Sequence, residues 1–269
     1  MSRAVAVITG ASSGLGEAFA RQVDAHPAFA DVAEIWLVAR REARLQALAA
    51  ALPSGRGVAV AVDLATEAGV EAVLARARDG AVRVRLLVNN AGFGLLGPFS
   101  GQDPQTLGRM LDLNVRAGTL LLRGLAAHMD AGACVVQVAS AAAYVPAPYF
   151  AAYAASKSYA LALALALREE WRAREISVCA ACPGPVATEF FAVAGGKTGG
   201  ENGGKDGGNA SGGAAAGDVV ALALRDVLEG RAVSHSGVST RLLGAAAGVL
   251  PRGLLVRLAG RRNLRRART

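Results

Sequence analysis

The segment from Thr9 to Gly16, TGASSGLG, constrains the fold of this chain more than any other part of the sequence. It follows a short apolar run, Ala4 to Thr9, which is typical of a buried strand. An amphipathic stretch to about Ala25 comes next and predicts a helix. Glycine permits the tight turn between them, and the free N–H groups at the start of the helix attract phosphate. The sequence therefore predicts a strand–turn–helix unit that binds a dinucleotide.

A tyrosine and a lysine, Tyr153 and Lys157, lie four residues apart in a run from Ala151 to Trp171 that lacks Gly and Pro and predicts a helix. Residues at this spacing share one helix face, where the ammonium group would lower the pKa of the tyrosine. Ser140 follows an apolar run, Cys134 to Ala139, that indicates a strand, and its hydroxyl can bind a substrate carbonyl. Such a pair is common by chance. It indicates proton-transfer chemistry only because the glycine loop accompanies it.

The order and separation of these motifs resemble those of the short-chain dehydrogenase/reductase family, in its single-domain type. The family pattern TGxxxGxG, NNAG, Ser and YxxxK matches Thr9–Gly16, Asn89–Gly92, Ser140 and Tyr153–Lys157, and the likeness covers about residues 3–192. It implies an α/β fold: a Rossmann-like, doubly wound parallel sheet of about seven strands in the order 3-2-1-4-5-6-7, with helices on both faces. Strands are expected near residues 3–9, 34–39, 57–62, 84–89, 133–139, 176–181 and, more weakly, 231–236.

The resemblance also implies roles for individual residues. Tyr153 would be the general acid and base, and Lys157 would bind the nicotinamide ribose. Ser140 would polarise the carbonyl, and Asn114 would position a water molecule in a proton relay. The expected cofactor-binding residues are Gly10, Ser12, Ser13, Gly14, Leu15, Gly16, Arg40, Asp63, Leu64, Asn90, Ala91, Gly92, Tyr153, Lys157, Pro183, Gly184, Val186 and Thr188.

The end of the second expected strand bears on the choice of cofactor. An acidic residue there would bind the ribose hydroxyls of NAD and repel a phosphate. This chain has Ala39, Arg40 and Arg41 instead, and an arginine can bind a 2′-phosphate with two hydrogen bonds. We therefore predict that NADP(H) is preferred over NAD(H), with Arg40 as the main contact. The alternative is that both arginines only begin a solvated helix face.

Length and composition predict one catalytic domain, residues 1–238, with a Gly-rich insert at 195–217. The insert is either a tolerated loop insertion or a flexible lid. Three cysteines in or beside core strands indicate a reducing compartment, and no signal sequence or membrane span is seen, so a cytoplasmic protein is expected. Cys179 and Cys182 have CxxC spacing without a second pair or a nearby His, so no metal site is expected.

The net charge of +8 is concentrated in a basic extension, residues 239–269. Leucines interleave with its arginines, so residues 252–268 can form an amphipathic helix that contacts an anionic membrane or another protein. They can equally be a solvated helix end whose leucines cover the main body. Aromatic residues are missing from this tail, so nucleic acid is not an expected partner. By resemblance, helices at 104–129 and 151–173 would form a homodimer.

Apolar residues flank the expected catalytic residues, with Phe93 to Leu95 after NNAG and Tyr144, Tyr149 and Phe150 before Tyr153. They favour a hydrophobic ketone, alcohol or acyl chain as the substrate. The predicted function is therefore NADP(H)-dependent interconversion of a carbonyl and an alcohol. One alternative is a sensor or scaffold that binds NADP(H) without catalysis. Another is an epimerase or dehydratase, although the short chain leaves little room for a sugar-nucleotide domain.

Overall fold

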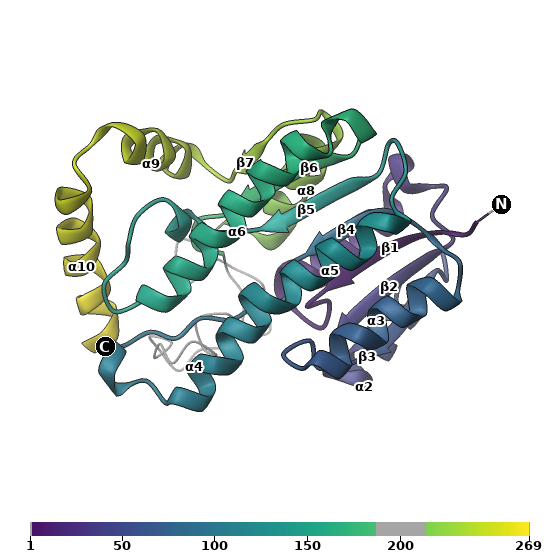
Figure 1. Ribbon diagram of the computed structural model, residues 1–269, viewed down its shortest axis with the longest axis horizontal. Coiled ribbons are helices and arrows are strands. Elements are labelled where there is room, and N and C mark those ends of the chain that lie inside the picture. The colour runs from purple at the N-terminus through teal and green to yellow at the C-terminus, as the bar shows by residue number, and fades with distance from the viewer. Residues whose placement is uncertain (1, 187–213, 269) are drawn as a thin grey trace.

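A computed structural model describes residues 2–186 and 214–268 of the chain. It contains a parallel sheet of seven strands in the order β3-β2-β1-β4-β5-β6-β7 (Figure 1), as predicted. The strands are β1 (Ala4–Thr9), β2 (Glu34–Ala39), β3 (Gly57–Ala61), β4 (Arg83–Asn89), β5 (Cys134–Val138), β6 (Ser177–Cys182) and β7 (Val233–His235). The helices are α1 (Gly14–Ala25), α2 (Glu42–Ala50), α3 (Glu67–Asp79), α4 (Pro104–Leu111), α5 (Gly118–Leu125), α6 (Ala151–Glu170), α8 (Ala216–Leu228), α9 (Val238–Val249) and α10 (Arg252–Arg268).

Helices cover both faces of the sheet. The side chains of its strands are therefore mostly apolar on both faces, instead of alternating between apolar and polar. In β1, Val5 and Val7 face a core formed with α3, α5 and α6. Ala6 and Ile8 face a second core formed with α1, α2 and α8. This arrangement explains why strands of parallel sheets are continuous hydrophobic runs in sequence. It also leaves the carboxyl ends of the strands as the exposed edge at which a site can form.

One continuous helix was expected at residues 104–129, and the structure differs from this expectation in one respect, the interruption of the helix. The chain forms α4, then a π-helical segment at Asp112–Ala117, then α5, which ends at Leu125. A π turn accommodates one extra residue, and such turns occur frequently at functional sites. Here the segment contains Asn114, whose side chain bonds to neighbouring backbone rather than to its own helix.

The C-terminal helices α9 and α10 lie at the same end of the molecule as the carboxyl ends of the strands (Figure 1). They follow β7, which is shorter than the predicted run at 231–236. Residues 195–213 of the expected insert lie outside the described residues, and α8 begins at Ala216.

Candidate active site

The glycine loop joins β1 to α1. Gly10 has a φ of +68°, and a Cβ atom at this position would lie 2.7 Å from Asn90 Nδ2. Only glycine tolerates this conformation and this close approach. At the end of the loop, α1 begins at Gly14 without a hydrogen bond from the Ser13 side chain to cap it. The first turn of α1 therefore offers backbone N–H groups and a favourable dipole to a phosphate.

The fully buried Thr9 ties the glycine loop to the NNAG segment. Its hydroxyl accepts hydrogen bonds from the N–H groups of Asn90 and Ala91, each at 2.9 Å. The Asn90 amide donates in return to the Thr9 carbonyl at 2.8 Å. These bonds hold the ends of β1 and β4 together at the point where the strand order reverses, which is where ligands bind in such folds. By resemblance the NNAG segment was expected to brace the central strand, but sequence analysis did not assign a part in this to the Thr9 hydroxyl.

The two arginines after β2 make different contacts. Arg41 donates to the hydroxyl of Ser12 from Nε (3.0 Å) and to the hydroxyl of Ser13 from Nη2 (2.7 Å). Arg40 is exposed and lines the same cleft. Arg41 therefore joins the glycine loop to the end of β2, a contact that sequence analysis did not assign. An anion at this corner would lie close to both guanidinium groups.

Asp63, one of the expected cofactor-binding residues, is held by its neighbours. Its Oδ2 lies 2.7 Å from Arg109 Nη2, and its Oδ1 accepts from the Ala65 N–H at 3.0 Å. Partial burial would raise the pKa of Asp63, but these hydrogen bonds outweigh it and keep the pKa below its ordinary value. Asp63 is therefore ionised at neutral pH. The neighbouring Leu64 is buried against the core and lines the cleft.

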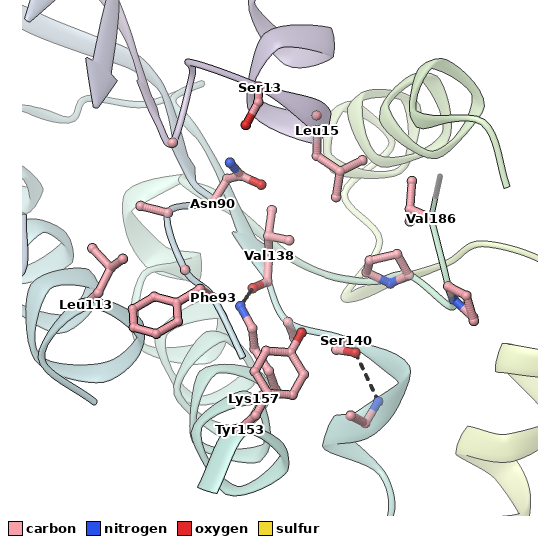
Figure 2. A pocket seen from close by; sticks show the side chains of 18 of the residues that line it. Ser13, Leu15, Asn90, Phe93, Leu113, Val138, Ser140, Tyr153, Lys157 and Val186 are labelled. Atoms are coloured by element: carbon pink, nitrogen blue, oxygen red, sulfur yellow. Dashed lines mark hydrogen bonds between the residues drawn. The ribbon is translucent and has the colours of Figure 1, made fainter. Parts of the chain in front are cut away.

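Tyr153 and Lys157 are buried on α6 and line the cleft (Figure 2). Lys157 Nζ donates to the Val138 carbonyl at 2.8 Å and lies 5.8 Å from the centre of the Tyr153 ring. Burial raises the pKa of Tyr153 to about 12, although its hydrogen bond with Ser140 opposes this. Burial also lowers the pKa of Lys157 to about 8.

The pKa of Tyr153 therefore moves upward, opposite to the lowering expected from the spacing of the pair. The reason is that the cost of burying a phenolate outweighs the hydrogen bond with Ser140, which favours the phenolate. At neutral pH Tyr153 retains its proton, and Lys157 is mostly charged. The arrangement presents a phenol that can donate a proton into the cleft.

Ser140 follows β5 and begins a short 3₁₀ turn, Ala141–Ala143. Its Oγ accepts from the Ala142 N–H at 3.1 Å and is hydrogen-bonded to the hydroxyl of Tyr153. The turn is fixed to the end of β6 because the Ala141 N–H donates to the Pro183 carbonyl at 2.8 Å. Two hydroxyl groups, from Ser140 and Tyr153, thus meet in the cleft and can bind one carbonyl oxygen (Figure 2).

Asn114 lies behind the wall of the cleft. Its Oδ1 accepts from the Phe93 N–H at 3.0 Å, and its Nδ2 donates to the Phe93 carbonyl at 2.8 Å. A Cβ atom on Gly92 would lie 2.8 Å from Asn114 Oδ1 and 3.5 Å from Lys157 Nζ. The glycine of NNAG is therefore required by close packing against the catalytic residues. Asn114 braces this loop, and a role in a water relay stays a prediction.

These residues surround a cleft of about 580 Å³. It is lined by every expected site residue except three: Gly16 and Asn114 lie outside its wall, and Thr188 lies outside the described residues. The structure therefore brings together the glycine loop, the arginine pair, the NNAG segment, the Ser–Tyr–Lys group and the Pro183–Val186 segment. The members of that last segment that line the cleft are Pro183, Gly184, Pro185 and Val186.

The C-terminal helices supply part of the cleft that sequence analysis missed. Thr240 and Leu243 of α9 and Asn263 of α10 line it. Asn263 is buried, and its Nδ2 donates to the Pro148 carbonyl at 3.1 Å. The two residues are 115 positions apart, so no local pattern could have revealed the contact. The segment treated as a separate basic extension is therefore a wall of the site.

A second, half-buried pair stabilises the turn that follows Ser140. The hydroxyl of Tyr144 is hydrogen-bonded to His235 Nε2 at 2.8 Å, and the two rings stack with their centroids 5.7 Å apart. Burial raises the pKa of Tyr144 far above its ordinary value and lowers the pKa of His235. Both side chains are therefore neutral near pH 7, and they link this turn to β7.

Comparison with known proteins agrees with this geometry. The family model for short chain dehydrogenases matches residues 4–197. Sulfoacetaldehyde reductase 2 of Chromohalobacter salexigens is 33% identical over 199 residues, which cover 71% of this chain and 76% of the relative. Seven strands in the family's order, the matching motifs and these findings show that the chain belongs to the short-chain dehydrogenase/reductase family, whose members are oxidoreductases acting on alcohol and carbonyl groups.

Two solved structures show what dinucleotides similar proteins bind. A short-chain dehydrogenase from Sphingobium yanoikuyae in complex with NADPH has a TM-score of 0.73 and 29% identity, covering 92% of this chain and 94% of that one. The 3-ketoacyl-(acyl-carrier-protein) reductase from Brucella melitensis complexed with NADH has a TM-score of 0.60 and 31% identity, covering 71% and 79%. A nicotinamide dinucleotide is common to both.

Proposed function

We propose that this protein interconverts a carbonyl and an alcohol on a hydrophobic small molecule, with NADP(H) as the preferred cofactor. One observation carries the proposal: the hydroxyls of Ser140 and Tyr153 meet, beside Lys157, in a cleft that also contains the glycine loop. A phenol that keeps its proton at neutral pH suits carbonyl reduction, because that direction needs a proton donor.

The end of the cleft away from the catalytic residues would hold the adenosine and pyrophosphate parts of the dinucleotide. The uncapped start of α1 would bind the pyrophosphate, as helix N-termini do. Arg40 and Arg41 would hold a 2′-phosphate, and no acidic residue ends β2 to repel one. Because similar proteins bind either NADPH or NADH, the preference for NADP(H) rests on these two arginines. The bound nicotinamide would supply or accept the hydride.

Four side chains of the protein would bind the substrate and cofactor and transfer the proton. Ser140 would hold and polarise the carbonyl oxygen, and Tyr153 would donate a proton to it. Lys157 would bind the nicotinamide ribose and keep a positive charge near the phenol as the proton leaves. Asn114 would hold the loop at Gly92 in place and position a water molecule for proton return.

The substrate end of the cleft is mostly apolar, with Phe93, Leu96, Phe150 and Leu243 in its wall. This lining supports a hydrophobic ketone, alcohol or acyl chain as the substrate. Asn263 is a polar exception at this end, and its amide would bind a hydrogen-bonding group of the substrate away from the reacting carbonyl.

A homodimer through the helices of the α4–α6 side is also proposed. Leu111, Tyr159 and Leu165 are 39–41% exposed on α4 and α6, where a second copy could cover them. Within the described residues all three cysteines are buried and free, which supports action in a reducing compartment.

The test is consumption of NADPH with a panel of apolar ketones, compared with NADH. We expect turnover with several ketones and a higher kcat/KM for NADPH. Tyr153→Phe should lose about 10²–10⁴ of kcat, the usual contribution of a positioned acid, while NADPH binding remains. Tyr159→Phe, on an exposed position of the same helix, is the matched control and should keep full activity. NADPH binding without turnover in the unaltered protein would instead support a sensor.

A further inference from the structure

Exposed apolar side chains gather on the C-terminal helices. Ten large hydrophobic side chains are exposed within the described residues, and six of them lie in the last 32 residues of the chain. These six are Val238, Leu242, Val249, Leu250, Leu254 and Leu258, with exposures from 43% to 86%. A cluster of this kind marks an interaction surface, whereas single exposed leucines are ordinary.

The exposed residues follow the helical repeat, so each helix has an outer apolar stripe. On α9, Val238, Leu242 and Val249 share one side, and the buried Thr240 lies on the other. On α10, Leu254 and Leu258 are one turn apart on the outer side, whereas Leu255 and Asn263 are buried. The inward faces already pack against the body and the cleft. The outer stripes have no such partner within the described part of the chain.

The same segment carries the excess positive charge of the protein. Residues 230–269 contain nine of the 29 Lys and Arg residues and none of the 21 Asp and Glu residues. Residues 1–229 therefore hold 20 basic and 21 acidic residues and are nearly neutral. In α10, arginines at positions 257, 261 and 265 follow Leu254 and Leu258 at helical spacing.

The positive charge of this segment indicates whether a second copy of the chain or an anionic surface would bind to it. A second copy meeting this face symmetrically would bring the same arginines together, and like charges at a contact are unfavourable. A surface of anionic phosphates attracts the arginines, and its lipid chains accept the exposed leucines. Within residues 2–186 and 214–268 no helix is long and apolar enough to cross a bilayer, so such a helix would lie in the interface.

We propose that α9 and α10 form a docking face for an anionic lipid bilayer, defined by Val238, Leu242, Val249, Leu250, Leu254, Leu258 and the exposed Arg257. Because the inner faces of these helices line the cleft through Leu243 and Asn263, docking would bring the site close to the lipid phase. If the proposed function is also right, apolar substrates would be taken from the bilayer. The docking itself does not depend on that function.

The experiment is sedimentation of the full chain with phosphatidylcholine vesicles and with vesicles that also contain phosphatidylglycerol. We expect binding to the anionic vesicles only, and its loss at high salt because the attraction is screened. Arg257→Glu should weaken binding about fivefold or more, since each basic residue near an anionic surface contributes on that scale. Leu254→Asp with Leu258→Asp should weaken it by about tenfold or more.

Phe99→Asp is the matched control, because Phe99 is 60% exposed but lies outside the docking face. It should bind vesicles as the unaltered protein does. Thermal melting of each variant shows that the fold is kept, and Leu242→Asp on α9 gives an independent variant should the α10 double variant not fold. No sedimentation, equal sedimentation with neutral vesicles, or binding insensitive to all these variants would overturn the proposal. Dimer dissociation by Leu254→Asp without vesicle binding would assign the face to self-association.

Discussion

The two ends of the cleft are built in different ways. The cofactor end is formed by short loops that follow β1, β2 and β4, and it is fixed by hydrogen bonds from backbone N–H groups to the Thr9 hydroxyl. The substrate end is closed by α9 and α10, which reach the site from the last part of the chain and contact it through side chains such as Asn263. The residues expected to bind the cofactor therefore come from local motifs. The residues expected to select the substrate are brought together by long-range packing. The predictions below test this division.

After Tyr153→Phe, the largest effect is expected at Ser140, between the two ends. Ser140→Ala removes a hydroxyl that binds the carbonyl oxygen and contacts Tyr153, so kcat should fall by about 10²–10³, as for other lost oxyanion donors. NADPH affinity should stay the same. Steady-state kinetics and a binding titration measure both. Unchanged kcat would show that the carbonyl binds elsewhere.

A substitution at the cofactor end should change only the kinetic constants for the cofactor. Replacing Arg40 by alanine should raise the KM for NADPH by about 10–100-fold, because charge-assisted hydrogen bonds are lost. The KM for NADH should hardly change. Arg21→Ala, on α1 and paired only with Glu17 among its described contacts, is the matched control. Equal effects on both cofactors would refute a 2′-phosphate site.

The pH dependence reports the buried pair. Reduction requires a protonated Tyr153, with a pKa of about 12, and a charged Lys157, with a pKa lowered to about 8 by burial. The kcat/KM for reduction, measured from pH 6 to 10, should be level below about pH 8 and fall above it, up to about tenfold per unit. A rate that rises with pH would mean that the phenolate is the active form.

The same pKa shift affects stability. The pKa of Lys157 is lower in the folded state than its ordinary value of 10.5, so the unfolded chain binds more protons between about pH 8 and 10.5. Stability from this group is therefore present above pH 10.5 and is lost as the pH falls through about 8. Lys157→Met should remove this dependence, which denaturant unfolding across that range would show.

The smallest effect is expected at the substrate end. Asn263→Leu removes the hydrogen bond to Pro148 and the polar group of the apolar wall. It should change the KM for ketones by about threefold to tenfold, which corresponds to the binding free energy of one hydrogen bond. The KM for NADPH should stay the same. If the KM for NADPH changed and the KM values for ketones did not, the proposed division of the cleft into a cofactor end and a substrate end would be wrong.

The sequence allowed the cofactor end to be predicted because its signals are local. The run Ala4–Thr9 and the glycines after it determine a strand and a turn within a few residues. The parts that were missed depend on tertiary contacts. The π segment at 112–117 forms where Asn114 bonds to Phe93, and Asn263 meets Pro148 across 115 positions. The upward pKa shift of Tyr153 was missed because burial cannot be read from a spacing.

The most direct test of the account follows the hydride itself. The protein is incubated with NADPH that carries deuterium at the transferable position of the nicotinamide and with an apolar ketone that it accepts. The account predicts that mass spectrometry finds one deuterium on the carbinol carbon of the alcohol, and that Tyr153→Phe forms almost no labelled product. An alcohol without deuterium, or labelled product formed equally fast by Tyr153→Phe, would contradict it.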